Sequence, residues 1–423
     1  MFSVRKESGA QASCRWEVWE IIRYIVLGLL GILVFANPFP HITSVKEVSY
    51  YLSLFLFLVL LGKGKVQFRP RTPFLVVGGL FFLWASVGAF FAVDQVNTIH
   101  DILFHLVRYV VIFYLLLTLY NTPKRVNLLL WITIFSTAAF LAWSIWYYYS
   151  YLGHAFTDRL GTAETWSKLD LLDQTPIGVI AYISLFGTAC CLFAMQERFS
   201  FLLKGAALGL LPLMMVPLYL SQERSGILAL VVVLLLAIRN LKVKGILLVL
   251  AVLFTLLSPV GKRFSVASLS GNLRIPMGYL SMEVIKDYPV TGIGYGMETF
   301  AKDLNLEEYR ERVGSSYNSV PIEDPHNILF DIAIRTGLVG LALFGGICMT
   351  FLSVCLRTIG SSEDLYAANM GRLALASGAG IFTASLFQPL FSHIPEFLIC
   401  LAFYLATMAW RLKESSEGIG SAL

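Results

Sequence analysis

The chain is 423 residues long, and 57% of its residues are hydrophobic whereas 14% are charged. A soluble domain carries about 25% charged residues, and a soluble core of this size could not hide so much apolar surface, so the composition excludes a soluble globular enzyme. The same hydrophobicity excludes a disordered chain. The net charge of +5 fits the Lys and Arg that membrane proteins collect on one side of the bilayer, and it does not indicate a nucleic-acid partner.

Twelve apolar runs are long enough to cross a bilayer as helices, for which ~20 residues are needed. They lie near residues 20–36, 45–61, 73–92, 99–120, 126–151, 176–196, 199–220, 225–240, 243–258, 327–356, 371–390 and 394–411. Prolines occupy many of the gaps, as expected at helix ends. We therefore predict an all-α integral membrane protein with about 12 transmembrane helices, forming a single polytopic membrane domain over residues 1–423.

Lys and Arg residues fall mainly on one side of these runs. Basic clusters such as those at 63–71 and 239–244 belong to one set of loops, whereas the alternate short loops hold Arg159, Lys168 and Arg224. Cytoplasmic loops are enriched in Lys and Arg. We therefore predict a multi-pass protein of the bacterial inner (cytoplasmic) membrane with both termini in the cytoplasm.

One connection is too long to be a passive link. Residues 259–326 form a large predicted periplasmic loop between helices 9 and 10, with helical signals at 275–287 and, on an amphipathic stretch, at 303–313. The shorter outer segment 152–175 carries charges of both signs. The Gly/Ser-rich tail at 413–423 is predicted to be a disordered cytoplasmic segment.

Two arginines stand out on the outer face. Arg224 occupies the tight turn 221–226 before an apolar helix, and Arg274 lies early in the large loop. A guanidinium is a rigid donor fork suited to phosphate. The structural alternatives are an interfacial arginine paired with Glu223 in the first case and a solvated loop charge in the second. Local sequence alone favours these alternatives.

The large loop returns to the membrane through the residues EDPHN at 323–327. Asp324 suits the N-cap of the tenth helix and Pro325 suits its first position, so His326 is predicted to lie in the first helical turn. The positive end of the helix dipole favours a neutral imidazole there, and a neutral imidazole can act as a general base. The alternative is an interfacial residue without a chemical role.

The fourth apolar run carries polar groups at helical spacing. Asp101, His105 and Arg108 recur at i, i+4 and i+7, so they are predicted to share one face, with Arg108 ~10 Å deep. A charge at the centre of a membrane helix costs roughly 2.5–3.5 kcal/mol, so the stripe must face protein, water or a polar ligand. A self-satisfied stripe that fixes helix packing and a stripe that faces a ligand are equally open.

The glycine-rich run GIGYG at 292–296 is not a nucleotide-binding motif, because no Gly-Lys-Ser/Thr follows it and no strand–turn–helix context surrounds it. We expect a flexible turn that lets the loop fold back onto the bundle. The outer face shows no metal-ligand spacing in the sequence. Neither a metal nor another cofactor is therefore expected.

The order and sidedness of these features resemble the O-antigen ligase family. The features that carry the resemblance are the twelve-span topology, the RSG turn at 224–226, Arg274, the run YPVTGIG at 288–294, PHN at 325–327 and RTGLVG at 335–340. Gly337 follows His326 by eleven positions, as in that family. The topology covers the whole chain, whereas the specific motifs occupy residues 221–340.

The resemblance implies a metal-independent glycosyltransferase. It would move O-antigen polysaccharide from undecaprenyl diphosphate onto the lipid A–core oligosaccharide at the periplasmic face, completing lipopolysaccharide. Arg224 and Arg274 would hold the diphosphate, and His326 would activate the acceptor hydroxyl. The candidate supporting residues are Asp101, His105, Arg108 and Asn327.

Two alternative functions are considered. An O-antigen polymerase would use the same donor with a second lipid-linked glycan as acceptor, but polymerases more often carry two substantial periplasmic loops, and here one loop dominates. A polytopic solute transporter is the alternative from a different class. Transporters tend to show internal repeats and charges at the membrane midplane, whereas this sequence has no evident repeat and its polar groups cluster at the outer face.

Overall fold

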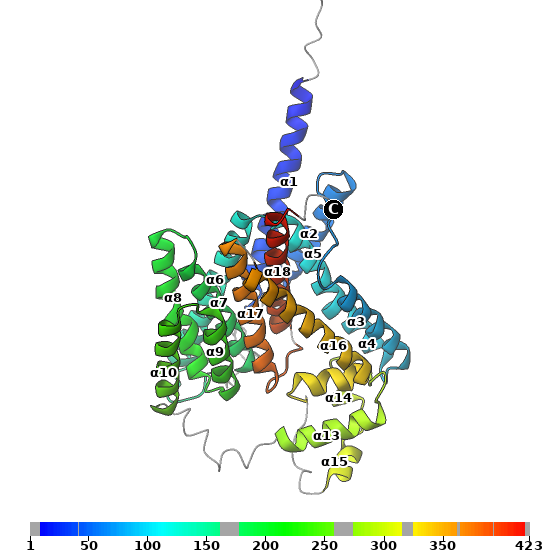
Figure 1. Cartoon of the computed structure of the whole chain (residues 1–423). Coiled ribbons are helices and arrows are strands. Elements are labelled where there is room, and N and C mark those ends of the chain that lie inside the picture. Colours follow the sequence, from blue (N-terminus) through cyan, green and yellow to red (C-terminus); the bar gives the residue numbers. More distant parts are fainter. Residues whose placement is uncertain are drawn as a thin grey trace, which may run out of the picture.

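The computed structural model describes residues 9–40, 42–160, 177–257, 274–314, 325–361, 364–391 and 393–418. Within these ranges the chain is helical and contains no strand. Figure 1 shows a bundle from which α1 (Gly9–Ala36) protrudes at one end, while α13, α14 and α15 of the large loop lie at the opposite end. The C-terminus lies near the end from which α1 protrudes.

The helices follow the predicted runs closely. They are α2 (Thr43–Gly62), α3 (Leu75–Gly88), α4 (Gln95–Asp101), α5 (Arg108–Leu119), α6 (Pro123–Ile145), α7 (Ile177–Gln196), α8 (Phe201–Leu220), α9 (Arg224–Ala237), α10 (Leu241–Leu257), α13 (Arg274–Asp287), α14 (Thr299–Lys302), α15 (Leu306–Val313), α16 (Ile328–Ser361), α17 (Leu365–Ser385) and α18 (His393–Ser416). Each predicted run overlaps at least one of them.

Among the described residues, eight helices are long and apolar enough to cross a membrane. Leu75–Phe91 and Arg224–Ala237 are shorter apolar helices. The other two helices at predicted spans are α10, which has 17 residues, and α17, which carries the polar residues Asn369 and Arg372. The chain is therefore an all-helical, multi-pass membrane protein, as predicted, and the number twelve stays a prediction.

Helix α17 lies at the centre of the bundle, packed against α7, α9, α16 and α18. Small residues allow the close approach. A Cβ atom at Gly380 would lie 2.5 Å from a methyl of Val233 on α9, and one at Gly378 would lie 2.6 Å from the ring of Phe351 on α16. Membrane helices associate through such close packing, because lipid tails are as apolar as the side chains. The packing of α17 fixes the segment that follows it, residues 386–391.

Two of the membrane helices contain a π-helical stretch. The fourth span runs through α4, the π-helix η2 (Ile102–Val107) and α5, and the sixth helix ends in the π-helix η3 (Trp146–Tyr151). A short 3-10 helix, η1 (Ala89–Phe91), precedes the fourth span. The wider π turn rotates the side chains that follow it, so a face predicted at 3.6 residues per turn does not continue through η2.

The large loop contains the helices that the sequence predicts at 275–287 and 303–313, now α13 and α15. Their apolar faces meet in a small separate core formed by Met277, Leu280, Val284, Ile293, Phe300, Leu304, Tyr309 and Ile334. Arg312 of α15 donates to the carboxylate of Asp287 at 2.7 Å, and the Tyr309 hydroxyl does so at 3.0 Å. These hydrogen bonds hold the pKa of the Asp287 carboxyl below its ordinary value.

The glycine-rich run at 292–296 is a packed strip, not a flexible turn. The amide of Ile293 donates to the carbonyl of Ile334 on α16 at 2.8 Å, and the carbonyl of Ile293 accepts from the amide of Val93 at 2.9 Å. Helix α16 is broken at Gly337, whose φ is +68° and whose added Cβ would collide with the carbonyl of Val290. The loop does return to the bundle here, as predicted, but hydrogen bonds hold it on two sides.

The tail differs from the prediction. Helix α18 continues to Ser416, so the first residues of the segment 413–423, predicted to be disordered, are helical. Lys413 explains part of this extension, because it lies 3.8 Å from Glu417 one turn later and donates to the carbonyl of Arg357. Residues 419–423 lie outside the described part of the chain.

Candidate active site

Arg224 is the first residue of α9, at the tight turn that the sequence singles out. Gln222 adopts a left-handed conformation with φ +51°, which turns the chain sharply after α8. A Cβ at Gly226 would lie 2.5 Å from the side chain of Leu218, so the two helices approach closely beside the turn. The turn thus places Arg224 at the N-terminus of a helix, where partial positive charge gathers.

The carboxylate next to Arg224 is buried and occupied. Glu223 is 5% exposed, forms an ion pair with Arg159, and accepts a hydrogen bond from Gln388 at 2.7 Å. Arg159 also donates to the carbonyl of Ser221 at 2.8 Å, which holds the turn from outside. The ion pair of Glu223 is therefore with Arg159, and not with Arg224 as in the structural alternative drawn from the sequence.

Arg274 is the first residue of α13. Its guanidinium carbon lies 5.8 Å from the ring centroid of Phe387, which follows α17. A guanidinium over an aromatic face is attracted by the ring quadrupole. This contact brings the start of the large loop onto the segment after α17.

His326 lies before α16, and not in its first turn as predicted. The helix begins at Ile328, and Asn327 is its capping residue, since its Oδ1 accepts from the amides of Leu329 at 2.9 Å and Phe330 at 3.3 Å. The prediction placed the cap at Asp324, which lies outside the described residues. His326 has a left-handed φ of +50°, which ends the loop just before the cap.

Arg274 and the neighbours of the other two predicted residues contact one short segment. Asn327, next to His326, donates to the carbonyl of Leu386 at 3.0 Å, Arg274 contacts Phe387, and Gln388 contacts Glu223, next to Arg224. Residues 386–388 are consecutive, so their Cα atoms lie within about 8 Å of one another. The N-terminal ends of α9, α13 and α16, which lie at or next to Arg224, Arg274 and His326, therefore approach the segment that follows α17.

The polar residues of the fourth span contact different partners and do not form one stripe. Asp101 is 5% exposed and accepts from the amide of Met297 at 2.6 Å. Arg335 of α16 holds the same strip from the other side, donating to the carbonyl of Gly296 at 2.5 Å while paired with Asp331. Asp101 and Arg335 thus hold residues 296 and 297, at the end of the glycine-rich strip. The sequence did not indicate this role for either residue.

His105 and Arg108 point to other helices. His105 Nδ1 lies 2.7 Å from Glu396 Oε2 on α18, and Arg108 donates to Glu47 on α2 at 2.7 Å. The π-helical turn between Asp101 and Arg108 explains why the three side chains diverge. Their supporting role in binding stays a prediction.

One group of side chains among the described residues has the donor types of a metal site. His105, His393 and Glu396 place one ligand atom each within 4.8 Å of one another, and the two imidazole rings are stacked 4.8 Å apart. His393 and Glu396 lie at the start of α18, a region that the sequence analysis did not single out. The sequence spacing gave no signal, because the ligands come from two spans that are distant in the chain.

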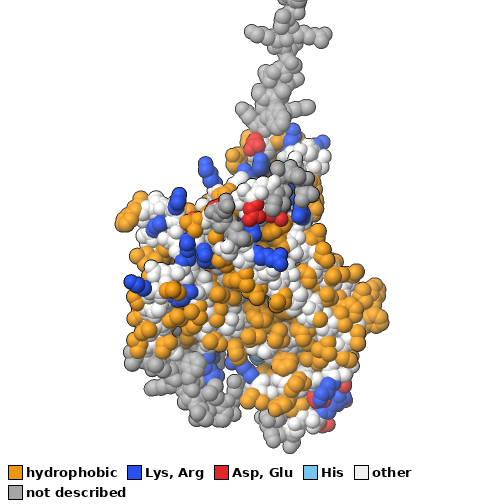
Figure 2. Space-filling view, viewed as in Figure 1, with side chains coloured by type: hydrophobic (Ala, Val, Ile, Leu, Met, Phe, Trp, Pro, Cys, Tyr) orange, Lys and Arg blue, Asp and Glu red, His pale blue; other side chains and the backbone are white. Residues whose placement is uncertain are grey.

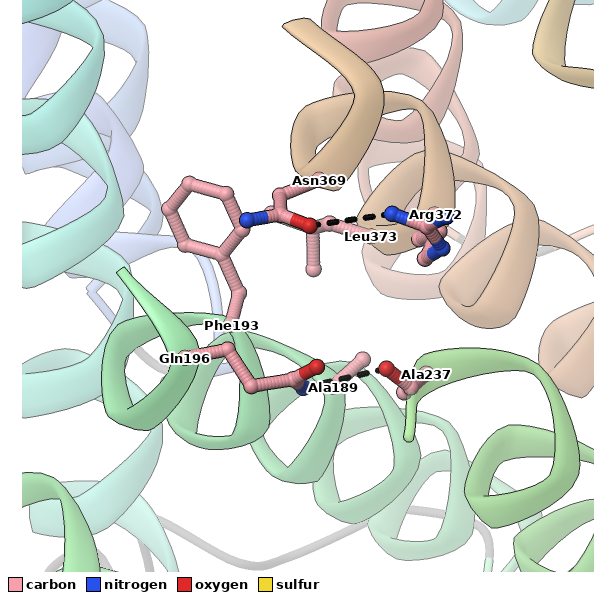
Figure 3. Close-up of a pocket in the computed structure, with 7 residues that line it drawn as sticks. All are labelled: Ala189, Phe193, Gln196, Ala237, Asn369, Arg372 and Leu373. Atoms are coloured by element: carbon pink, nitrogen blue, oxygen red, sulfur yellow. Dashed lines mark hydrogen bonds between the residues drawn. The ribbon is translucent and has the colours of Figure 1, made fainter. Parts of the chain in front are cut away.

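A small cavity of about 10 Å³ lies between α7, α9 and α17, away from the candidate site (Figure 3). Gln196 donates to the carbonyl of Ala237 at 3.0 Å, and Arg372 donates to Asn369 at 3.0 Å. The cavity has room for about one water molecule. A cavity of this size is too small for a glycan. The hydrogen bonds of its polar groups stabilise the packing of the helices around it.

The chain was compared with known proteins. Residues 183–345 match the family model described as O-antigen ligase. No significant match was found among curated proteins. The matched region begins in α7, ends in α16 and contains Arg224, Arg274 and His326. This family, shared by O-antigen ligases and polymerases, acts on lipid-linked glycans. The chain is thus a multi-pass membrane protein whose residues 183–345 match the O-antigen ligase family model.

Proposed function

We propose that this protein transfers O-antigen polysaccharide from undecaprenyl diphosphate to the lipid A–core oligosaccharide, at the periplasmic face of the bacterial inner membrane. The observation that carries the proposal is the meeting of α9, α13 and α16 at residues 386–388. The segments that meet there carry the two arginines and the histidine that the family resemblance implies, which supports the proposal. The orientation follows from the basic loops, which put the large loop outside.

The donor side of the reaction requires stabilisation of a leaving diphosphate. Arg224 and Arg274 supply two guanidinium groups, and the N-termini of α9 and α13 add the partial positive charge of the helix dipole. Glu223 would oppose an anion, but its charge is offset by Arg159 and Gln388. Preorganised donors of this kind can stabilise developing negative charge without a metal, which supports a metal-independent transfer.

The acceptor side requires removal of a proton from a sugar hydroxyl. In the proposed step, the imidazole of His326 takes that proton, the hydroxyl oxygen bonds to the anomeric carbon of the donor glycan, and undecaprenyl diphosphate leaves with the bonding electrons. The neighbour of His326, Asn327, is fixed by its cap and by Leu386. A base held in this way is oriented before the substrate arrives, which lowers the entropic cost of reaction.

An O-antigen polymerase is the second candidate, because the family domain is shared by ligases and polymerases. Gene deletion in the native host, followed by gel analysis of lipopolysaccharide, separates the two. Loss of a ligase leaves core-only lipopolysaccharide and accumulated lipid-linked polymer, which is the result we expect. Core carrying a single repeat unit would identify a polymerase instead.

Complementation tests the site in the same strain. The wild-type gene should restore the polymer ladder, whereas a His326→Ala gene should not, at equal membrane abundance of the two proteins. A control variant, Lys286→Gln, removes an exposed pair with Glu283 on α13 and should restore the ladder. Restoration by His326→Ala to the wild-type level would contradict the proposed site.

A further inference from the structure

A polar cavity lies at the end of the bundle opposite the large loop. Its volume is about 400 Å³, and α1, α18, the end of α5 and the segment between α2 and α3 line it. Four of the lining side chains are cationic, namely Arg23, Lys65, Arg69 and Arg411, and the described residues that line it include no Asp or Glu. Figure 2 shows Lys and Arg gathered over this end of the molecule.

The cavity lies at the level where candidate membrane spans end together. These spans are Val18–Ala36, Thr43–Gly62, Gln95–Leu119 and His393–Ser416. The ends of several spans mark the boundary between the hydrocarbon core and the phospholipid headgroups. A cationic pocket between helices at this level faces lipid phosphates before any soluble anion, and such pockets suit anionic headgroups.

Two of the arginines have different roles in the cavity. Arg411 donates to the carbonyls of Arg69 at 2.8 Å and Arg71 at 3.1 Å, so it builds the wall and fixes the backbone that carries the Arg69 side chain. Arg23 Nε is buried and has no hydrogen-bond partner within the described part of the chain, and the ion pair of Arg23 with Glu20 is long, at 3.8 Å. A buried N–H group without an acceptor costs free energy, so the Nε group of Arg23 suggests that a ligand enters the cavity and supplies an acceptor.

We propose that this cavity binds the phosphate of an anionic phospholipid headgroup in the leaflet opposite the large loop. Arg23, Lys65 and Arg69 supply the positive charge, while Arg411 holds the segment 69–71 in place. Guanidinium and ammonium groups are the side chains that proteins use for phosphate. The proposal does not depend on the function proposed above, because the cavity lies at the other end of the bundle.

The test compares two charge-matched triple variants of the full-length protein. Arg23→Gln, Lys65→Gln and Arg69→Gln remove three cavity cations and leave Arg411 intact. Arg198→Gln, Arg239→Gln and Lys242→Gln remove two arginines and one lysine that are exposed elsewhere and that the sequence puts on the same side. Native mass spectrometry then measures retention of phosphatidylglycerol and phosphatidylcholine, and thermal unfolding checks that each variant folds. If the cavity triple variant does not fold, the single variant Arg69→Gln, at an exposed residue of the cavity, replaces it in the test.

Wild type and the control triple should retain phosphatidylglycerol in preference to phosphatidylcholine. The cavity triple should bind phosphatidylglycerol roughly a hundredfold more weakly, the effect of three cations lost near a phosphate surface, and Arg69→Gln should show a partial loss. Equal retention by the cavity variants and wild type would overturn the proposal, as would equal retention of the two lipids by wild type. Inorganic phosphate is titrated in a separate arm. Displacement of the lipid by millimolar phosphate would assign the cavity to a soluble anion and overturn the lipid source.

Discussion

Gln388 donates a hydrogen bond from Nε2 to Oε2 of Glu223 at 2.7 Å, which joins the segment after α17 to the residue before Arg224. Glu223 is 5% exposed, and Arg159 is its other strong partner. The contact therefore connects the central helix of the bundle to the turn that carries a predicted diphosphate ligand. A buried carboxylate that loses a donor costs about 1–3 kcal/mol.

We expect Gln388→Leu to lower both stability and glycan transfer, because it leaves the Glu223 carboxylate short of one donor beside Arg224. Thermal unfolding in detergent and initial transfer rates measure the two effects. The matched control is Gln95→Leu, since Gln95 is exposed and bonds to the carbonyl of Phe90 five residues earlier. If Gln388→Leu behaves like this control in both assays, the contact has no role in holding the site.

Arg224→Lys and Arg274→Lys should both transfer glycan poorly. Lysine keeps the charge but loses the planar fork that bonds to a phosphate through two donors. The loss of one charge-assisted contact should cost roughly 1.5–3 kcal/mol, or about ten- to a hundredfold in rate. Donor binding and single-turnover transfer are the measurements.

Arg310→Lys provides the control for this pair. Arg310 lies in the large loop and pairs within α15 with the exposed Glu307, so an exchange to lysine, which keeps the charge of this pair, should change transfer little. Wild-type transfer by both Arg224→Lys and Arg274→Lys, in folded protein, would remove the two arginines from the donor site.

His326→Ala should lose most transfer while donor binding persists, because the arginines are untouched. General-base assistance is typically worth 10²–10⁴-fold. The left-handed φ of +50° adds a complication, since a substitution there also changes the backbone preference. His326→Asn separates the two effects, because asparagine tolerates this conformation but cannot accept the proton at neutral pH.

His326→Asn should therefore be about as inactive as His326→Ala but more stable to heat. His326→Gln, which can donate and accept hydrogen bonds, should also transfer poorly. Near-normal turnover by His326→Gln would reduce His326 to a positioning group, and normal turnover by His326→Ala would exclude it from the reaction.

The apolar runs predicted the membrane helices well, because a bilayer demands ~20 apolar residues wherever a helix crosses it. Two of the three described loop helices, α13 and α15, were also predictable from local signals, whereas the four-residue α14 was not. The start of α16 was not, since Asp324, Pro325 and Asn327 are all acceptable near a helix N-terminus and the choice among them depends on tertiary contacts. Asn327 serves as the cap while its side-chain amide also donates to the carbonyl of Leu386, just after α17.

The sequence signals only part of the candidate site, whose role stays a prediction. Arg224, Arg274 and His326 carry motif signals that local sequence can show, whereas Gln388 and Glu396 carry none. Their roles arise because α17 and α18 bring them to residues that are distant in the chain, Glu223 and His105. The sequence also did not predict that Asp101, His105 and Arg108 contact different partners. Nothing in the apolar pattern indicates the π-helical turn of η2 that lies between them.

Gly337→Ala should strongly destabilise the protein. Gly337 has a φ of +68°, and a Cβ there would collide with the carbonyl of Val290, which lies just before the glycine-rich strip. Gly345→Ala on the same helix is the matched control, because no atom lies within 4 Å of its added Cβ. A helical Gly→Ala change of this kind is neutral or stabilising by roughly 0.5–1 kcal/mol. Similar melting temperatures for the two variants would show that the strip does not constrain α16.

Transfer should persist in EDTA. Among the described residues, the group that could instead hold a metal ion is formed by His105, His393 and Glu396. His105 Nδ1 and Glu396 Oε2 are 2.7 Å apart, a hydrogen-bond distance that implies a shared proton. Two ligands of a tetrahedral zinc ion at ~2.0–2.2 Å from the metal lie more than about 3 Å apart, and both must be deprotonated. The geometry therefore fits a hydrogen bond between two spans better than a metal centre.

Purified protein is assayed for transfer after treatment with EDTA, before and after Mg²⁺, Mn²⁺ or Zn²⁺ is added back. His393→Gln is assayed in parallel, because it removes one potential ligand while leaving the His105–Glu396 hydrogen bond in place. We expect transfer within about twofold of the untreated wild type in each case, since the two arginines can neutralise the diphosphate without a metal. If EDTA abolishes transfer, an added metal restores it, and His393→Gln cannot be restored, then these three residues form a catalytic metal site and the metal-independent mechanism is wrong.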